Sequence, residues 1–156
     1  MKKLNGFLGM VFLGSVLTLG MNSCKGTKAC KDDNISAAGS DDSHNKGMNC
    51  MQCHQANGDG AGCFIAAGTV YDMTMSNTVS SGKVDFYTGP NETGTLKQTI
   101  MIDSKGNFYT TADFSPVGLY PVVTGPSGNK KEMGSALNSG ACNSCHGIST
   151  DKLWID

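Results

Sequence analysis

Residues 95–111 read TLKQTIMIDSKGNFYTT, a stretch with the pattern of two β-strands joined by a tight turn. Apolar and β-branched side chains recur with partial period-two alternation from Leu96 to Ile102, which indicates a strand with one buried face. The cluster DSKG (103–106) has the composition of a turn, and NFYTT (107–111) begins a second strand. This stretch therefore predicts a β fold rather than a helical one.

The same pattern continues on both sides of this stretch. Further short segments rich in β-branched and aromatic residues are FIAAGTVYD (64–72), GKVDFYTG (82–89) and GLYPVV (118–123). The chain also has 21 glycines and 4 prolines, which favour a loop-rich β module. Because proline cannot donate to a sheet ladder, the strand that contains Pro121 is expected at an edge or a bulge. We expect a mainly β chain with a small antiparallel β-sandwich at about 64–128.

Two pentapeptides stand on either side of these segments, CMQCH at 50–54 and CNSCH at 142–146. C-x-x-C-H is the attachment signature of c-type haem. Two thiols three positions apart can reach both vinyl groups of a porphyrin, and the next histidine supplies the proximal nitrogen to the iron. The sequence therefore predicts two covalently bound haem c groups. The four attaching cysteines and two proximal ligands would be Cys50, Cys53, Cys142, Cys145, His54 and His146.

Other uses of paired cysteines fit less well. A zinc site could use the C-x-x-C pair twice, but the gap between the pairs far exceeds that of a zinc ribbon. A thioredoxin-type redox pair would need a βαβ context, which this sequence lacks. A disulfide inside each motif would be strained and would leave the histidines unexplained. Haem attachment is therefore the preferred interpretation.

The chain begins like an exported protein. A lysine pair and an apolar run lead to MNSC (21–24), which resembles a relaxed bacterial lipobox with Cys24 as the lipid-modified residue. We expect a lipoprotein-type signal peptide at 1–23 and a flexible tether at 24–43, followed by a dihaem cytochrome domain at 44–156. The protein would be periplasmic or at the cell surface, anchored to a membrane by lipid. An ordinary signal peptide or a single membrane anchor is the alternative.

The cysteine count is odd, and exported proteins seldom leave a thiol free. Seven cysteines are present. If Cys24 takes a lipid and four others attach haem, Cys30 and Cys63 remain and could form a disulfide. An intermolecular bond from Cys30 is the alternative.

The order of these segments resembles known families. AGTVYD, GKVDFY, IDSKGNFYT and GLYPVV, at about 67–128, resemble the carboxypeptidase-regulatory or transthyretin-like sandwich. CHQANGDGAG (53–62) resembles the glycine-rich loop that follows the motif in many c-type cytochromes, and ACNSCHG (141–147) resembles a second attachment segment. The whole chain is similar to a family of exported dihaem c-type cytochromes in which such a sandwich lies between two CxxCH motifs.

The distal iron ligands are the least determined part of the site. Only His44 remains as a third histidine, so one monomer cannot supply two bis-histidine haems. We expect His44 to ligate one iron. Met133 lies where the resembling family often carries methionine and is expected at the other, with Met48 as the weaker alternative. Because a short segment cannot easily wrap around a haem, we expect crossing, with His44 serving the haem at His146 and Met133 the haem at His54.

The resemblance implies an electron carrier rather than an enzyme, one that transfers electrons between redox partners outside the cytoplasm. Two alternatives stay open. One is a dihaem peroxidase or small-molecule reductase, and the other is a structural module that assembles, as a homo-oligomer or multihaem complex, into an electron conduit. The expected partners are other redox proteins and the membrane. Nucleic acid is not expected, because all 12 basic residues are lysines and they form no basic stripe.

Overall fold

A computed structural model describes Cys30 and residues 43–156. The predicted signal peptide, Cys24 and the rest of the predicted tether lie outside the described residues. The described part contains short strands and two single-turn 3₁₀ helices. In chain order these are η1 (Cys50–Gln52), β1 (Ala66–Thr69), β2 (Gly82–Tyr87), β3 (Leu96–Ile102), β4 (Asn107–Thr110), β5 (Tyr120–Thr124), β6 (Lys130–Glu132) and η2 (Cys142–Ser144).

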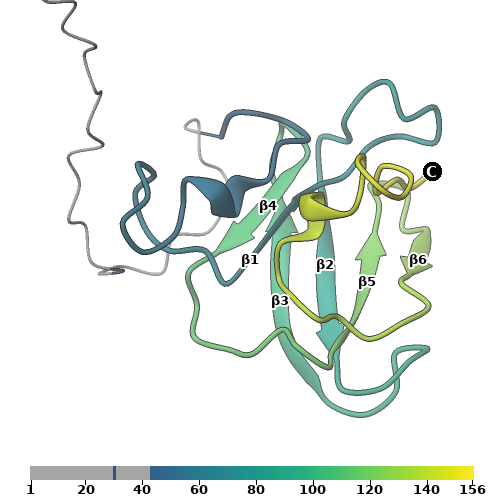
Figure 1. Cartoon of the computed structure of the whole chain (residues 1–156). Helices are drawn as coiled ribbons and strands as arrows, with labels where there is room; N and C mark the ends of the chain where they lie inside the picture. Colours follow the sequence, from purple (N-terminus) through teal and green to yellow (C-terminus); the bar gives the residue numbers. More distant parts are fainter. Residues whose placement is uncertain (1–29, 31–42) are drawn as a thin grey trace, which may run out of the picture.

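The strands form two antiparallel sheets (Figure 1). One contains β1 and β4, and the other has the order β3-β2-β5-β6. The predicted turn after β3 leads the chain from the larger sheet to the smaller one. The Asp103 carboxylate holds this turn by accepting hydrogen bonds from the backbone N–H groups of Lys105 at 2.8 Å and Asn107 at 2.9 Å. The prediction of a mainly β chain is confirmed.

Each predicted β segment contains a strand, but β6 has no counterpart in the sequence analysis. Its residues KKE are charged and show no apolar alternation, and they are extended because they pair with Val122–Thr124 of β5. The pairing makes β5 an interior strand, so the edge position expected for Pro121 is wrong. The Pro121 carbonyl accepts from Met133 N, just beyond the end of β6. Its missing N–H therefore faces that end and removes no bond to β2.

The small sheet is buried on both faces, because its alternate residues enter two different clusters. Ala66 of β1 and Phe108 of β4 belong to the main core, which also contains Phe86 and Ile100 of the larger sheet. The alternate residues, Ala67 of β1 and Tyr109 of β4, pack instead with Phe64 and with Cys50 and Met51 of the first cysteine motif. The small sheet thus separates the core from the first motif.

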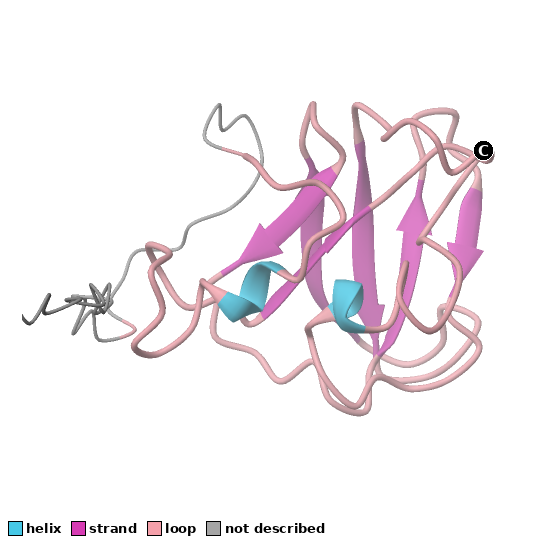
Figure 2. Cartoon of the chain, turned by 45° about the horizontal axis from the view of Figure 1, so that its top comes forward, coloured by secondary structure: helices cyan, strands magenta, loops and turns pink. Residues whose placement is uncertain are grey.

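Both cysteine motifs lie on the same side of the sheets. Figures 1 and 2 show η1 and η2 next to each other. The helix η1 lies in front of β1 and β4, and η2 lies in front of β1 and β2. A backbone hydrogen bond from Ala67 N to Gly140 O, 2.9 Å long, anchors the segment before η2 against β1. The chain ends that carry the motifs are therefore brought together by the small sheet.

Two described residues of the predicted tether are fixed to the body. Ser43 is buried, and its hydroxyl accepts a hydrogen bond of 2.8 Å from Asn107 Nδ2. Cys30 is joined to Cys63 by a disulfide, the pairing raised by the cysteine count. The predicted tether at 24–43 is thus attached to the folded body at Cys30 and Ser43. No helix among Cys30 and residues 43–156 is long and apolar enough to cross a membrane.

Substitutions at two neighbouring residues of β3 test which of its side chains point into the core. Ile100 is 1% exposed and Met101 is 45% exposed. We expect Ile100→Ala to lower the free energy of unfolding by about 2–5 kcal/mol, because it leaves a cavity in the core. Met101→Ala should change it by no more than about 0.5 kcal/mol. Chemical denaturation measures both, and equal effects would contradict the register.

Candidate functional site

The two CxxCH motifs have the same backbone conformation. In each, the second cysteine and the histidine donate their N–H groups to the carbonyl of the first cysteine. The bonds to Cys50 O are 3.2 Å from Cys53 and 3.0 Å from His54, and the corresponding bonds to Cys142 O are 3.3 and 3.0 Å. Neither motif forms an internal disulfide, so all four thiols are available. Each turn thus gathers two thiols and an imidazole in one place.

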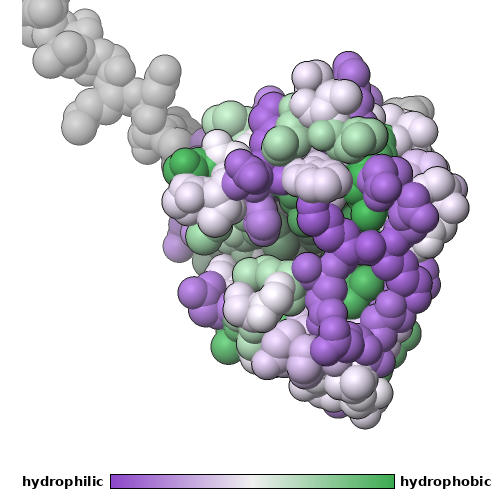
Figure 3. Space-filling view, turned by 90° about the vertical axis from the view of Figure 1, so that its right-hand side faces the viewer, coloured by the Kyte–Doolittle hydropathy of each residue, from purple (hydrophilic) through white to green (hydrophobic). Residues whose placement is uncertain are grey.

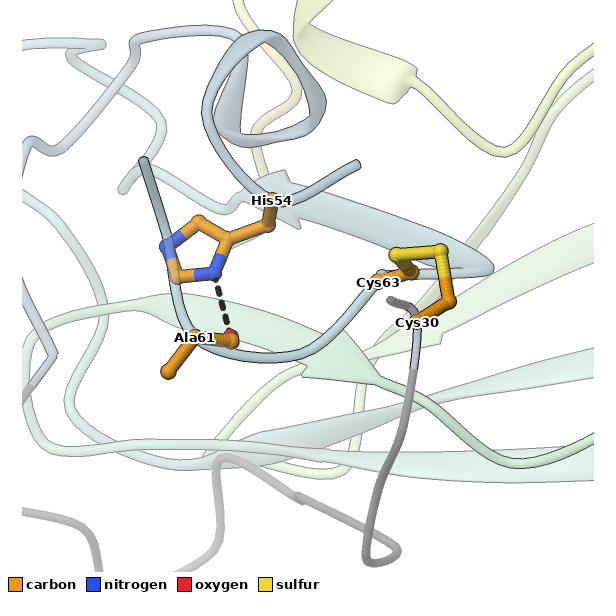
Figure 4. Close-up of a disulfide and its surroundings, with 4 residues drawn as sticks. All are labelled: Cys30, His54, Ala61 and Cys63. Atoms are coloured by element: carbon orange, nitrogen blue, oxygen red, sulfur yellow. Dashed lines mark hydrogen bonds between the residues drawn. A yellow bond between two sulfur atoms is a disulfide. The ribbon is translucent and has the colours of Figure 1, made fainter. Parts of the chain in front are cut away.

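The histidines of both motifs are held in the same tautomer. His54 Nδ1 lies 2.8 Å from the carbonyl oxygen of Ala61 (Figure 4), and His146 Nδ1 lies 2.9 Å from that of Asp151. A carbonyl can only accept, so Nδ1 carries the proton and the neutral ring keeps its lone pair on Nε2. Backbone carbonyls orient metal-ligating histidines in this way. Each histidine is therefore prepared to bind a metal through Nε2.

The first histidine is also held by its ring faces. His54 stacks on Phe64 with centroids 4.0 Å apart and planes 5° apart, and Phe64 stacks on Tyr109. The loop after the motif passes close by: a Cβ added at Gly60 would lie 2.6 Å from His54 Nδ1. The Cys30–Cys63 disulfide closes the end of the same loop (Figure 4). Glycine at residue 60 thus allows the loop to bring Ala61 to the imidazole.

The His54 cavity has a volume of about 530 Å³. It is lined by both motif thiols, by the stacked aromatic rings and by His44. The ring centroids of His44 and His54 lie 5.9 Å apart. Imidazoles on opposite sides of one metal ion place their centroids roughly 6 Å apart, given metal–nitrogen bonds of about 2.0–2.1 Å. The separation therefore suits two axial ligands of a single iron.

The His146 cavity is smaller, about 330 Å³, and mainly apolar. Its walls contain Cys142, Cys145 and His146, together with Met133 and core side chains. Trp154 also lines it, with Lys131 Nζ 2.8 Å from the centroid of the indole. The β6 side of the molecule, which contributes Lys131 and Met133, is covered mostly by hydrophilic side chains (Figure 3). Both cavities have volumes typical of ligand sites.

The two candidate ligands lie beside the motifs nearest to them in the chain. His44 lines the His54 cavity and Met133 lines the His146 cavity, whereas the sequence analysis expected each to serve the other motif. The position of His44 results from a tight reversal between His44 and the first motif. Met48 N donates to Asn45 O at 3.0 Å, and Gly47 adopts a positive φ of 79°. This turn lets a short segment bring His44 into the cavity that His54 lines.

The residues fit haem better than zinc. Burial raises the pKa of Cys142 to about 12 and also raises the pKa of Cys50. Among the residues that the structure describes, no three His, Cys, Asp or Glu side chains are grouped to hold a metal ion. A covalently attached haem needs thioethers and two axial ligands, and each cavity offers these groups.

Several contributors to the site were not found from the sequence. The carbonyls of Ala61 and Asp151 carry no side-chain signal, since any residue can supply a carbonyl. Trp154, at the end of the chain, has no motif around it. Asn143 occupies a variable position of the second CxxCH motif, where no residue type is demanded. Only the folded loops bring these groups to the two sites, so the sequence alone could not identify them.

Gly60→Ala tests the support of the first histidine. The added methyl would collide with the His54 ring and should separate Nδ1 from the Ala61 carbonyl, so the fixed tautomer is lost. Histidine tautomers can be read from imidazole ¹⁵N chemical shifts. Gly134→Ala is the matched control, because a Cβ there meets nothing within 4 Å. An unchanged His54 tautomer in Gly60→Ala would contradict this account of the loop.

Comparison with protein-family models, with curated proteins and with solved structures finds no match to this chain. The site is therefore described by its own geometry. Two cavities each combine a pair of thiols, an imidazole with Nδ1 protonated, and one further side chain able to ligate iron.

Proposed function

We propose that this chain is a dihaem c-type cytochrome that transfers electrons between redox proteins outside the cytoplasm. The observation that carries this proposal is the repeated site. At both CxxCH turns, unpaired thiols and a Nδ1-protonated histidine border a cavity, and a second candidate ligand lines the same cavity.

Each residue has a defined task in this proposal. Cys50 and Cys53 attach the first haem, and Cys142 and Cys145 attach the second. His54 and His146 would hold the iron through Nε2, and His44 and Met133 would be the further ligands at the respective sites. When bound, each haem supplies an iron that gains and loses one electron. Filled distal positions favour an electron carrier over a peroxidase or reductase, which needs an open one.

The two sites would differ in potential. His44 and His54 provide nitrogen ligands on both sides, whereas Met133 provides a thioether opposite His146. Methionine ligation raises the reduction potential relative to bis-histidine ligation. The His146 site would therefore hold an electron more strongly, which gives transfer within the molecule a direction.

Export and a scaffold role complete the proposal. The Cys30–Cys63 disulfide supports an oxidising compartment outside the cytoplasm. A lipid on Cys24 would hold the protein at a membrane, near its redox partners. The two sheets act as a small sandwich that fixes the haem segments. Cys53 and Cys145 are exposed, so each haem would present an edge to a transient partner through a small surface patch.

Mass and colour test the proposal directly. Two haems joined through thioethers should add roughly 1.2 kDa to the chain, according to the stoichiometry of the attachment signature. We expect this mass together with a Soret band after expression in a host that matures c-type cytochromes. Cys142→Ala combined with Cys145→Ala should keep half of the added mass. A colourless, unmodified product from such a host would contradict the proposal.

The local pairing of ligands can be tested in the single-haem variant that lacks Cys142 and Cys145. Only the haem at His54 is then present, so His44→Ala should change its low-temperature spin-resonance spectrum. Met133→Ala should leave that spectrum unchanged and serves as the matched control. The opposite result would restore the crossed arrangement. In the complete protein, Met133→Ala should remove the near-infrared band of methionine-ligated iron.

A further inference from the structure

Asn143 is the one fully buried side chain in either attachment turn. It is 2% exposed, whereas η1 contains no buried residue. Its position between Cys142 and Cys145 does nothing for haem attachment, which uses only the flanking cysteines and histidine. A buried amide is unfavourable unless its hydrogen bonds are made, so this asparagine calls for a physical reason.

The hydrogen bonds of Asn143 leave its own motif. Its Oδ1 accepts from Thr69 N at 3.1 Å, and its Nδ2 donates to Thr69 Oγ1 at 3.0 Å. The same Nδ2 donates to the carbonyl oxygen of Met48 at 2.9 Å. Met48 lies two residues before Cys50. One side chain of the second motif is therefore bonded both to β1 and to the entrance of the first motif.

Groups from both motifs approach one carbonyl oxygen at this point. The Cys50 thiol lies 3.6 Å from the Met48 carbonyl oxygen that also accepts from Asn143. The side-chain amide nitrogen of Asn143 and the sulfur of Cys50 thus converge on one oxygen atom. Strand β1 also lies close to the second motif, because a Cβ added at Gly68 would lie 3.0 Å from the Cys142 Cβ. We call this meeting point of β1 and the two motifs the Asn143 junction.

We propose that Asn143 is a positioning residue that fixes the separation and orientation of the two attachment turns, and with them the electronic coupling of the two haems. This inference rests on the proposed function. Haems joined to Cys50 and Cys142 would have neighbouring edges at the Asn143 junction. One electron would leave the iron between His44 and His54 and reduce the iron at His146. No bond forms and no proton moves through Asn143 in that exchange.

Thr69 gives the junction its rigidity. Its hydroxyl donates to Asn107 Oδ1 at 2.6 Å and accepts from Asn143 and from Gly47 N, so its hydrogen-bonding capacity is filled. Asn107 Nδ2 in turn donates to the His44 carbonyl at 3.1 Å. Loosening Asn143 should therefore alter how the two turns lie relative to each other without removing any ligand.

The test compares haem–haem coupling in the mature holoprotein. Two closely held haems split the Soret circular-dichroism band and broaden the spin-resonance signals of the oxidised irons. We expect Asn143→Ala to weaken both effects while haem content and axial-ligand spectra stay as in the wild type. Ser144→Ala is the matched control in the same turn, since its exposed hydroxyl bonds only nearby groups, and it should keep the coupling.

A second variant keeps the inference testable if Asn143→Ala does not mature. Thr69→Val removes the hydroxyl that anchors Asn143 and leaves both motifs intact, and it should weaken the same coupling. Wild-type coupling in a haem-loaded Asn143→Ala or Thr69→Val protein would overturn the role of Asn143. A wild-type protein with both haems but no coupling would also overturn it, while leaving the proposed function standing. A wild-type protein without haem would instead contradict the proposed function.

Discussion

A buried hydrogen-bond network around Thr69 joins the two cysteine motifs to the small sheet. Thr69, Asn107 and Asn143 are each no more than 2% exposed, and they come from β1, β4 and η2. Buried polar groups are tolerated only when their partners are in place, so the network forms as a unit. It binds the segment around His44 and both cysteine motifs to the small sheet. Sites at opposite ends of the chain are thereby held on one support.

The small sheet can serve as this support because it is covered on both sides. The larger sheet and the core stabilise one face, and the first motif with Phe64 packs on the other. The two candidate sites have the same backbone turn at the CxxCH motif, but different side chains line their cavities. The N-terminal segment supplies an imidazole to one, and the strand β5–β6 region supplies a thioether to the other. A proposed difference in potential thus follows from which chain segments the fold places beside each turn.

Much of the fold could be predicted, because alternation and turn composition are local properties. The segments around β1 to β5 were found in this way, while β6 was not, since its KKE sequence is extended only through pairing with β5. Pro121 was expected at an edge for a sound local reason. Proline lacks an N–H to donate, and in the structure this missing donor faces the end of β6, where it removes no bond to β2. The crossed arrangement was expected because the reversal at Asn45 and Gly47, which places His44 at the His54 cavity, has no clear sequence pattern.

By itself, the sequence determined the two CxxCH turns, the β character and the cysteine arithmetic that leaves Cys30 and Cys63 as a pair. These depend on residue type and spacing along a few neighbouring positions. Only the tertiary structure decided which further side chain lines each motif's cavity, which carbonyls orient the imidazoles and how the two turns are joined through Asn143. Those relations join residues far apart in the chain, through backbone carbonyls and buried amides that carry no local pattern, and the packing of β1 against β4 brings them within reach.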